Sequence, residues 1–246
     1  MSLRLRPDYR ALVLGATGAL GQAFVDALAR DPRCAEVVPV GRTRRVVDVA
    51  SSGTAPTAPW LPAWDLRDEA SLVALAAALT GPFHWVIDAT GALTVDGHGP
   101  EKRLADVGAN GLAHSMQVNA IGPVLLLRCL SPLLARGERV VWAKLSARVG
   151  SIEDNRKGGW YSYRMAKAAL NQGLQTAAIE LARQRPQLVV AAMQPGTVRS
   201  RLSQPFVGEA ATAPADAVAG LLTALDGLEP NGRAHFVDHA GLVVPW

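Results

Sequence analysis

The 246-residue sequence predicts an α/β fold, with one parallel sheet flanked by helices, and two observations carry that prediction. Short apolar segments alternate with segments of helical periodicity along the whole chain, which is typical of strands joined by crossover helices. Two of the apolar segments, residues 11–14 and 84–91, also lead into turns of small residues. We therefore expect a single doubly wound domain, residues 1–246, whose parallel sheet has about seven strands.

The individual elements follow from local patterns. Apolar segments bounded by glycine, proline and polar residues predict strands at residues 11–14, 36–40, 60–65, 84–91, 138–146, 187–196 and 234–238. Helical periodicity predicts helices at residues 22–31, 68–80, 112–135, 161–184 and 215–225. Pro123 predicts a kink in the third of these helices, because proline has no backbone N–H to donate. Residues 43–59 show little periodicity and predict an irregular crossover.

Composition and charge narrow the class of protein. The chain is 49% hydrophobic and 19% charged, which is typical of a globular domain with a large core. Its net charge of +4 comes with no long basic run, so we expect no nucleic-acid partner. We expect no membrane span and no signal peptide, and hence a cytoplasmic protein. Cys34 and Cys129 lack the spacing of a metal site, and no metal is predicted.

A glycine-rich turn joins the first strand to the first helix. It reads GATGALG, from Gly15 to Gly21, in the strand–turn–helix context in which a phosphate-binding loop forms. Gly15 permits the tight turn, Gly18 lets the backbone approach a pyrophosphate, and Gly21 lets the helix pack closely on the strand. A tight turn without a ligand is the alternative, and the place of the motif in the first strand–helix unit favours the nucleotide.

The end of the second strand indicates which dinucleotide binds. A carboxylate at this position usually accepts the ribose 2′-hydroxyl of NAD, but here Arg42 stands there, with Arg44 and Arg45 close by. Guanidinium groups suit a phosphate, so NADP is expected, with NAD as the second choice and a basic surface loop as the alternative without a ligand. Asp65, at the end of the third expected strand, is placed to bond an adenine amino group.

Residues 158–174 contain a candidate proton donor. Tyr163 and Lys167 are four residues apart, so on a helix their side chains lie on one face, about one turn apart. A phenol is a poor acid at neutral pH unless its anion is stabilised, and a nearby ammonium group does that. The pair alone is weak evidence, because this spacing is common. Asn119, amid apolar neighbours in the long helix, is more often a packing residue than a catalytic one.

With these segments in order, the chain resembles the short-chain dehydrogenase/reductase family over essentially its whole length. Besides the basic residue after the second strand and Asp65 after the third, the matching texts are GATGALG, DATG, MQVNAIGP, LSARVG, YSYRMAK and QPGTVRS. Each text is weak alone, and their order and spacing make the resemblance strong. The texts DGHGPEKRL and GSIEDNRKGGWYSYR and the ending VPW are similar to the branch called C-factor-like or C-signal-like. The resemblance implies a Rossmann-type domain that binds NAD(P).

The resemblance also implies a role for each matching residue. Tyr163 is then the general acid that protonates the substrate oxygen, and Lys167 holds the ribose hydroxyls and lowers the pKa of Tyr163. Asn119 orders a water in the proton relay, and Thr197 lies near the nicotinamide carboxamide. The implied cofactor-binding residues are Gly15, Thr17, Gly18, Ala19, Leu20, Gly21, Arg42, Asp65, Leu66, Ala89, Thr90, Gly91, Tyr163, Lys167, Pro195, Gly196, Thr197 and Val198.

Two departures from the family pattern bear on the reaction. The glycine motif reads GxxGxxG, which is commoner among epimerase- and dehydratase-like relatives than among reductases of this length. The family has Ser-Ser-x-x-Gly after the fifth strand, and its second serine bonds the substrate oxygen, whereas this chain has Ala147 there, after Ser146. Neighbouring residues of an extended chain point to opposite sides, so Ser146 replaces the missing serine only if the strand end is twisted or shifted. We expect that replacement.

Three functions remain open at this point. The leading one is an NADP-dependent oxidoreductase, of the carbonyl reductase or alcohol dehydrogenase type, acting on a small-molecule carbonyl or alcohol. The second is an NAD(P)-binding signalling or regulatory protein with weak catalysis, which fits Ala147. The third is an epimerase or dehydratase of a nucleotide sugar, for which 246 residues leave little room.

The substrate pocket is expected in connecting segments at the carboxyl ends of the strands, residues 92–110, 147–160 and 198–214. The family resemblance further implies a homodimer or homotetramer formed through the helices near residues 112–135 and 161–184.

Overall fold

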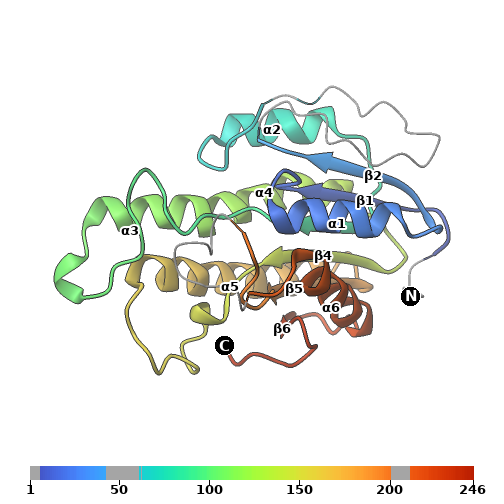
Figure 1. The fold of residues 1–246 in the computed structure, drawn as a ribbon. Coiled ribbons are helices and arrows are strands. Elements are labelled where there is room, and N and C mark those ends of the chain that lie inside the picture. The colour runs from blue at the N-terminus through green and yellow to red at the C-terminus, as the bar shows by residue number, and fades with distance from the viewer. Residues whose placement is uncertain (1–5, 43–60, 62, 201–210) are drawn as a thin grey trace.

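The computed structural model describes residues 6–42, 61, 63–200 and 211–246 (Figure 1). In this part of the chain, six parallel strands form one sheet in the order β2-β1-β3-β4-β5-β6. The strands are β1 (Tyr9–Leu14), β2 (Cys34–Val40), β3 (Trp85–Asp88), β4 (Val140–Leu145), β5 (Leu188–Gln194) and β6 (Ala234–Asp238). The order reverses next to β1, which is where a doubly wound sheet opens its ligand crevice.

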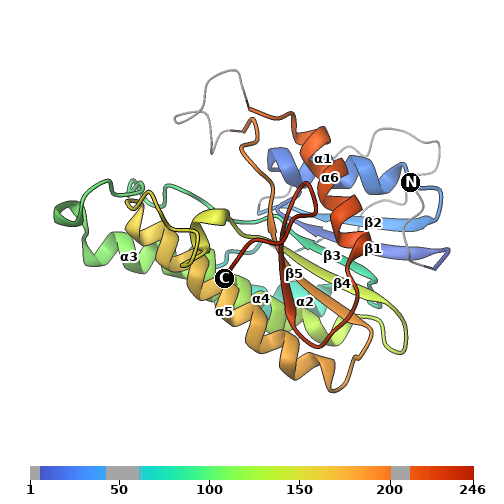
Figure 2. The same cartoon turned by 90° about the horizontal axis from the view of Figure 1, so that it is seen from below.

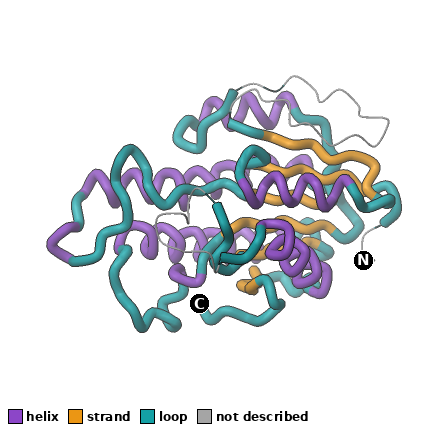
Figure 3. Tube along the Cα trace, in the orientation of Figure 1, coloured by secondary structure: helices purple, strands orange, loops and turns teal. Residues whose placement is uncertain are grey.

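Helices cover both faces of the sheet, as Figures 1 and 2 show. The α-helices are α1 (Ala19–Ala29), α2 (Glu69–Ala78), α3 (Ala109–Met116), α4 (Gly122–Leu130), α5 (Tyr161–Ala182) and α6 (Pro214–Gly227). Short turns of helix are η1 (Leu104–Asp106), η2 (Gln117–Ile121), η3 (Ser131–Leu133) and η4 (Arg148–Gly150). The tube in Figure 3 shows the loops that connect them. The doubly wound α/β fold is confirmed.

The core has two halves, one on each face of the sheet. The first is built on α2, α4 and α5 and includes Leu126 and Trp142, and the second is built on α1 and α6 and includes Phe24 and Val141. Trp142 and Val141 are neighbours on β4, and successive side chains of a strand point to opposite faces. Because both faces of the sheet are covered, positions that point to either face are apolar, and the strands are continuous apolar runs.

The third expected strand is wrong in its described part, since Leu61 and residues 63–65 are not in a strand. The polar groups of this segment bond side chains and a turn instead of an adjacent strand. Trp64 donates from Nε1 to the carbonyl of Gly41 at 2.8 Å. The Ser71 hydroxyl in α2 bonds both the N–H and the carbonyl of Asp65, at 3.0 and 3.1 Å. The described sheet therefore has six strands where about seven were expected.

The long helix expected at residues 112–135 is present as α3, η2, α4 and η3, which follow one another without a break from residue 109 to residue 133. The change expected at Pro123 takes the form of a π-helical turn, η2, in which Gly122 donates to the carbonyl of Gln117 five residues back. Pro123 has no N–H, so the carbonyl of Asn119 lacks its ordinary partner four residues ahead. By length and composition this helix could cross a membrane, but here its side chains Leu126, Leu127 and Leu130 lie buried in the core.

Candidate active site

The turn after β3 lies at the centre of the candidate site. Gly15, which has φ +74°, follows β1, and a Cβ added to it would lie 3.0–3.1 Å from backbone atoms of Ala89 and Thr90. Gly91 is in the same turn, and a Cβ there would lie 3.2 Å from Asn119 Oδ1 and 3.6 Å from Lys167 Nζ. One short turn therefore brings the glycine loop next to the residues of α5 and η2.

The glycine loop has the geometry of an anion-binding helix start. Gly18 N donates to the Gly15 carbonyl at 3.0 Å, and no side chain caps the N-terminus of α1. Thr17, Gly18 and Ala19 are exposed. A Cβ on Gly21 would collide with the Gly15 carbonyl, so the helix packs against the turn as closely as predicted. The free N–H groups of the first helical turn fit the pyrophosphate of a dinucleotide.

Tyr163 and Lys167 lie one turn apart on α5, as predicted, and both are buried, with 8% and 2% of their surface exposed. The Lys167 ammonium lies 5.5 Å from the centre of the Tyr163 ring and donates to the Leu145 carbonyl at 3.0 Å. Burial raises the pKa of Tyr163. Burial, together with the charge of Lys144, holds the pKa of Lys167 well below the ordinary lysine value. The lowering of the Tyr163 pKa by Lys167 stays a prediction for the complex with cofactor.

The start of α5 is held from outside by Glu101. The residue before the helix, Trp160, has a left-handed backbone with φ +56° and provides no side-chain cap. Instead, one carboxylate oxygen of Glu101 accepts from the N–H and from the hydroxyl of Ser162, at 3.0 and 2.9 Å. The Trp160 ring also meets the Tyr163 ring edge-on, with centroids 6.3 Å apart. A residue from the loop at 92–110 therefore positions the helix that carries Tyr163.

Asn119 is fully buried in the π-helical turn and bonds the turn after β3. Its Oδ1 accepts from Ala92 N at 3.0 Å and its Nδ2 donates to the Ala92 carbonyl at 2.8 Å. Both polar atoms of the side-chain amide therefore bond the backbone of Ala92. The role of Asn119 in a water relay stays a prediction. The π-helical turn is what places Asn119 at this point.

The Ser146 hydroxyl points toward α5. It donates to Asn171 Oδ1 at 2.6 Å, and both residues are buried. Ala147 follows in an extended backbone, with φ −158° and ψ 147°. A hydroxyl has one proton to give, so orienting a substrate carbonyl would require Ser146 to turn away from Asn171. The replacement of the family serine by Ser146 stays a prediction.

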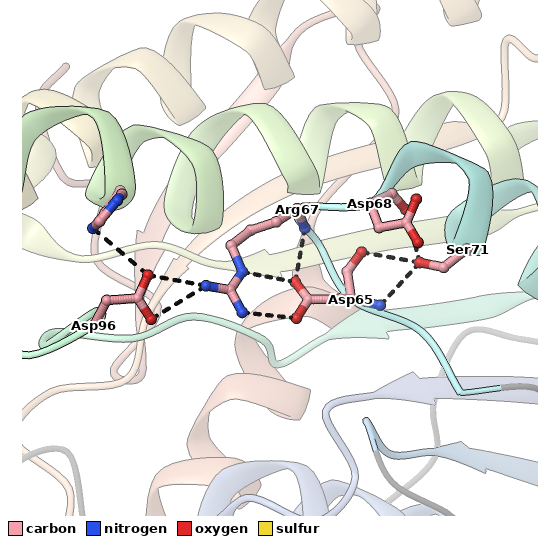
Figure 4. Close-up of polar contacts among 6 residues, drawn as sticks. Asp65, Arg67, Asp68, Ser71 and Asp96 are labelled. Carbon is pink, nitrogen blue, oxygen red and sulfur yellow. Dashed lines mark hydrogen bonds and ion pairs between the residues drawn. The ribbon is translucent and has the colours of Figure 1, made fainter. Parts of the chain in front are cut away.

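The expected adenine contact, Asp65, already has a cationic partner. Arg67 bonds both oxygens of the Asp65 carboxylate, at 3.1 Å each, and the hydrogen bond from Arg67 lowers the pKa of Asp65 (Figure 4). The same guanidinium reaches Asp96 in the loop at 92–110, at 3.0 Å. Arg42 is exposed at the end of β2, whereas Arg44 and Arg45 lie outside the described residues. The next predicted contact, Leu66, is buried in the core.

The turn after β5 lies at the same edge of the parallel sheet as the turn after β3. Gly196, with φ +77°, packs on the imidazole of His239, and Thr197 accepts from Thr212 N at 2.9 Å. Val198 is buried and pairs with Thr212. The third expected substrate loop, at 198–214, continues from here, but residues 201–210 lie outside the described part of the chain.

A groove of about 900 Å³ lies along the first expected substrate loop. It is lined by His98, Gly99, Pro100, Glu101, Lys102, Arg103, Asp106, Gly108, Ala109, Asn110 and Gly111. Neither Tyr163 nor Lys167 lines it, so we do not identify it with the place where the reaction would occur.

A buried ion pair that was not predicted from the sequence lies beside Lys167. Asp88 and Lys144 are direct partners in the register of β3 and β4, and their charged atoms are 3.1 Å apart. Both side chains are essentially inaccessible. The signal was available, since Lys144 is the one charged residue in the apolar run VVWAKL.

Known proteins that are similar to this chain include reductases and dehydrogenases. The family model described as enoyl-(acyl carrier protein) reductase matches residues 15–221. The C-signal protein of Myxococcus xanthus is 37% identical over 145 residues, which are 58% of this chain and 83% of that protein. A 1-hydroxy-2-glutathionyl-2-methyl-3-butene dehydrogenase of Rhodococcus sp. (strain AD45) is 29% identical over 189 residues, which are 75% of this chain and 79% of that protein.

Solved structures show the same architecture. A protein of Burkholderia multivorans, described as a short-chain dehydrogenase/reductase with bound NADP, superposes with a TM-score of 0.78 at 26% identity, over 98% of this chain and 100% of that one. The NADPH-bound carbonyl reductase from chicken fatty liver has a TM-score of 0.81 at 22% identity, with the same coverage, and shows the fold. The residues that the family model matches run from the glycine loop into α6 and include strands β2 to β5. The chain belongs to the short-chain dehydrogenase/reductase family of oxidoreductases.

Proposed function

We propose that this protein is an NADP-dependent oxidoreductase that interconverts a small-molecule alcohol and its carbonyl compound. The proposal rests on one observation: the glycine loop and the Tyr163–Lys167 pair lie on either side of the turn after β3. The turn from Ala89 to Ala92 packs on Gly15 of the glycine loop and faces Lys167, which lies beside Tyr163. The start of α1 would hold the pyrophosphate of a dinucleotide, and the Tyr163–Lys167 pair would hold its nicotinamide end.

The residues present fit such a cofactor. The N–H groups of the exposed residues Thr17 and Ala19 would hold the pyrophosphate. Arg42 would hold the 2′-phosphate, and Lys167 and Tyr163 the nicotinamide ribose. Of the other predicted contacts, Ala89, Thr90 and Gly91 lie in the central turn. When bound, the cofactor supplies or accepts the hydride.

Proton transfer falls to Tyr163. Its phenol would donate the proton to the substrate oxygen in reduction, and the phenolate would take the proton back in oxidation. Lys167 would stabilise the phenolate, because an unpaired ammonium favours a nearby anion. Asn119 would hold the water that returns a proton to Tyr163 after each turnover. Ser146 is the candidate to orient the substrate carbonyl, provided that its hydroxyl breaks its hydrogen bond to Asn171. The alcohol named in the Rhodococcus relative supports this class of substrate.

Cofactor choice is tested by titration calorimetry with NADPH and NADH. We expect tight binding of NADPH and weaker binding of NADH, with Arg42→Ala narrowing the difference because it removes a phosphate partner. Arg30→Ala, which changes an exposed arginine at the end of α1, is the matched control. Equal affinity for both cofactors in the wild type would discard the role of Arg42, and binding of neither would discard the proposed function.

Chemistry is tested by substitution of two tyrosines on one helix. Tyr163→Phe should abolish NADPH-dependent reduction of a panel of aldehydes and ketones. Tyr161→Phe, two positions earlier on α5, should keep it, because Tyr161 has Met165 and not a lysine four residues on. Unchanged turnover in Tyr163→Phe would refute the assignment of the proton donor.

A signalling or regulatory protein with weak catalysis is the second candidate. It is favoured by Ala147 in the place of the family serine and by the similarity to the C-signal protein. It predicts NADPH binding with turnover that stays negligible across the panel. Robust turnover that is lost in Tyr163→Phe would exclude it.

We also propose a cytoplasmic homodimer or homotetramer. Ile121, Met165 and Ile179 are large apolar side chains exposed on η2 and α5, at 43%, 51% and 46%. Burial of these side chains between two copies would stabilise the assembly. Light scattering of the purified protein should give the mass of two or four chains, and Met165→Lys should shift it toward one.

A further inference from the structure

The buried pair formed by Asp88 and Lys144 lies next to the candidate proton donor and is not used by the proposed mechanism. Both residues project from the sheet on the side of α5, since the neighbouring Val86 and Trp142 belong to the core half built on that helix. Removing two charges from water is costly, and a well-packed apolar pair there would often serve stability as well or better. Stability alone therefore does not explain this buried ion pair, and we look for its role in the neighbouring candidate site.

Lys144 holds the central turn by several bonds. Its ammonium donates to the Thr90 carbonyl at 2.5 Å, to the Thr90 hydroxyl at 3.0 Å and to Asp88 Oδ1 at 3.1 Å. Asp88 in turn accepts from Thr90 N at 2.9 Å, which closes the turn locally. Gly91 follows directly and faces Lys167. The position of the backbone in front of Lys167 is thus fixed by Lys144.

Lys144 also occupies the nearby carboxylate. Lys167 forms no ion pair with a carboxylate in the described part of the chain, and its ammonium donates a hydrogen bond to the Leu145 carbonyl. The charged or titratable groups that face it are Lys144 from β4, Asp88 from β3 and Tyr163 from its own helix. Asn119, which faces the site from the π-helical turn, is neutral.

We propose that Lys144 is a positioning residue of the candidate site, which fixes the turn from Asp88 to Gly91 and, by pairing with Asp88, leaves Lys167 without a carboxylate partner. This inference rests on the proposed function for its purpose. A Lys167 paired with Asp88 would direct its charge to that carboxylate, whereas an unpartnered Lys167, when protonated, directs its charge to the phenolate of Tyr163 and to the ribose.

The inference can be tested without substrate or cofactor, because the chain has only four lysines, Lys102, Lys144, Lys157 and Lys167. Nuclear magnetic resonance of protein with isotopically labelled lysine follows each ammonium through a pH titration, and conservative Lys→Arg variants assign the signals. In the wild type, Lys167 should lose its proton at lower pH than the exposed Lys102 and Lys157.

Four variants separate charge from packing. In Lys144→Gln, Asp88 loses its partner and acts on Lys167, so the midpoint of Lys167 should rise by about one pH unit or more. Lys144→Arg keeps the charge and should keep the midpoint. The double variant Asp88→Asn/Lys144→Gln removes both charges and should bring the midpoint back toward the wild type. Lys157→Gln, an exposed control, should not move it.

An unchanged midpoint of Lys167 in Lys144→Gln would overturn the inference, whatever happens to thermal stability. If Lys144→Gln does not fold, Asp88→Asn replaces it, and the midpoint of Lys167 must then fall because its negative neighbour is gone. An unchanged midpoint in that variant is equally fatal. In calorimetry, NADPH should bind Lys144→Gln about tenfold more weakly than the wild type. Absence of NADPH binding in the wild type would refute the proposed function, while the titration still tests the link between Lys144 and Lys167.

Discussion

Restoring the missing serine is the sharpest test of how the site treats a substrate oxygen. Ala147 stands where the family has the serine that bonds this oxygen, and its backbone is extended, a conformation that serine adopts freely. Ala147→Ser adds one hydroxyl without changing the backbone. We expect it to raise turnover of carbonyl compounds with NADPH.

The expected increase in kcat follows from the contribution of one hydrogen-bond donor to the rate. Preorganised hydrogen-bond donors to a developing oxyanion contribute about 10²–10³ in rate, so Ala147→Ser should raise kcat toward that range. Ser146→Ala should act differently. It removes a 2.6 Å bond to Asn171, whose Nδ2 has no partner in the described part of the chain, and burial of the orphaned amide costs about 1–3 kcal/mol of stability.

The assay follows oxidation of NADPH with a panel of aldehydes and ketones, and thermal unfolding is measured on the same preparations. Wild type, Ala147→Ser, Ser146→Ala and the double variant form one cycle. For a chain of this length, each kcal/mol should lower Tm by about 2–4 °C in Ser146→Ala.

One pattern would refute the reasoning. If Ser146→Ala lowers kcat a hundredfold at unchanged Tm while Ala147→Ser has no effect, then Ser146 releases Asn171 and is itself the donor. The replacement expected from the sequence would then be correct.

Three further predictions concern the glycine loop, the buried lysine and the helix start. Gly21→Ala should lower the free energy of unfolding by about 1–3 kcal/mol and weaken NADPH binding, because the new Cβ collides with the Gly15 carbonyl. Chemical denaturation measures the first effect and calorimetry the second. An unchanged free energy of unfolding would contradict the close packing of Gly21 on Gly15. Burial and the charge of Lys144 lower the pKa of Lys167, so between that pKa and the ordinary value near ~10.4 the unfolded chain binds more protons and stability rises with pH, by at most about 1.4 kcal/mol per unit. Lys167→Met should remove this part of the slope in pH-dependent denaturation; equal slopes in the two proteins would show that Lys167 keeps its ordinary pKa. Glu101→Ala should cost about 1 kcal/mol, the usual value of a helix cap, because Ser162 N loses its acceptor; Asp106→Ala is the control on the same loop, and equal loss in both would contradict the cap.

The sequence predicted the fold well because that prediction depends on local patterns. Strands that are apolar on both faces, a glycine turn before a helix and a Tyr–Lys pair at helical spacing are each visible within a few residues. The strand assignment failed at residues 61 and 63–65 because an apolar segment cannot show whether an adjacent strand or a side chain satisfies its backbone. Here Ser71 does so for Asp65.

The remaining misses concern contacts between distant segments. The register of β3 against β4 brings Asp88 to Lys144, and 56 residues of sequence separate them. Likewise, the pairing of Arg67 with Asp96 depends on where the loop at 92–110 returns to the sheet. A charged residue in an apolar strand does signal a buried partner, but it does not name that partner.

The π-helical turn at Gln117–Ile121 has a consequence for how this protein tolerates insertions and deletions. A π turn holds one residue more than the α turn it replaces, so it is equivalent to a single-residue insertion in a continuous helix. Removing one residue there would restore the α register and rotate α3 by about 100° relative to α4. The segment that leads into α3 would be carried round with it, away from α5. Helix length between residues 109 and 130 is therefore constrained as strictly as the identity of any side chain in it, and gene variants that change this length by one codon should lose function even where every functional residue is kept.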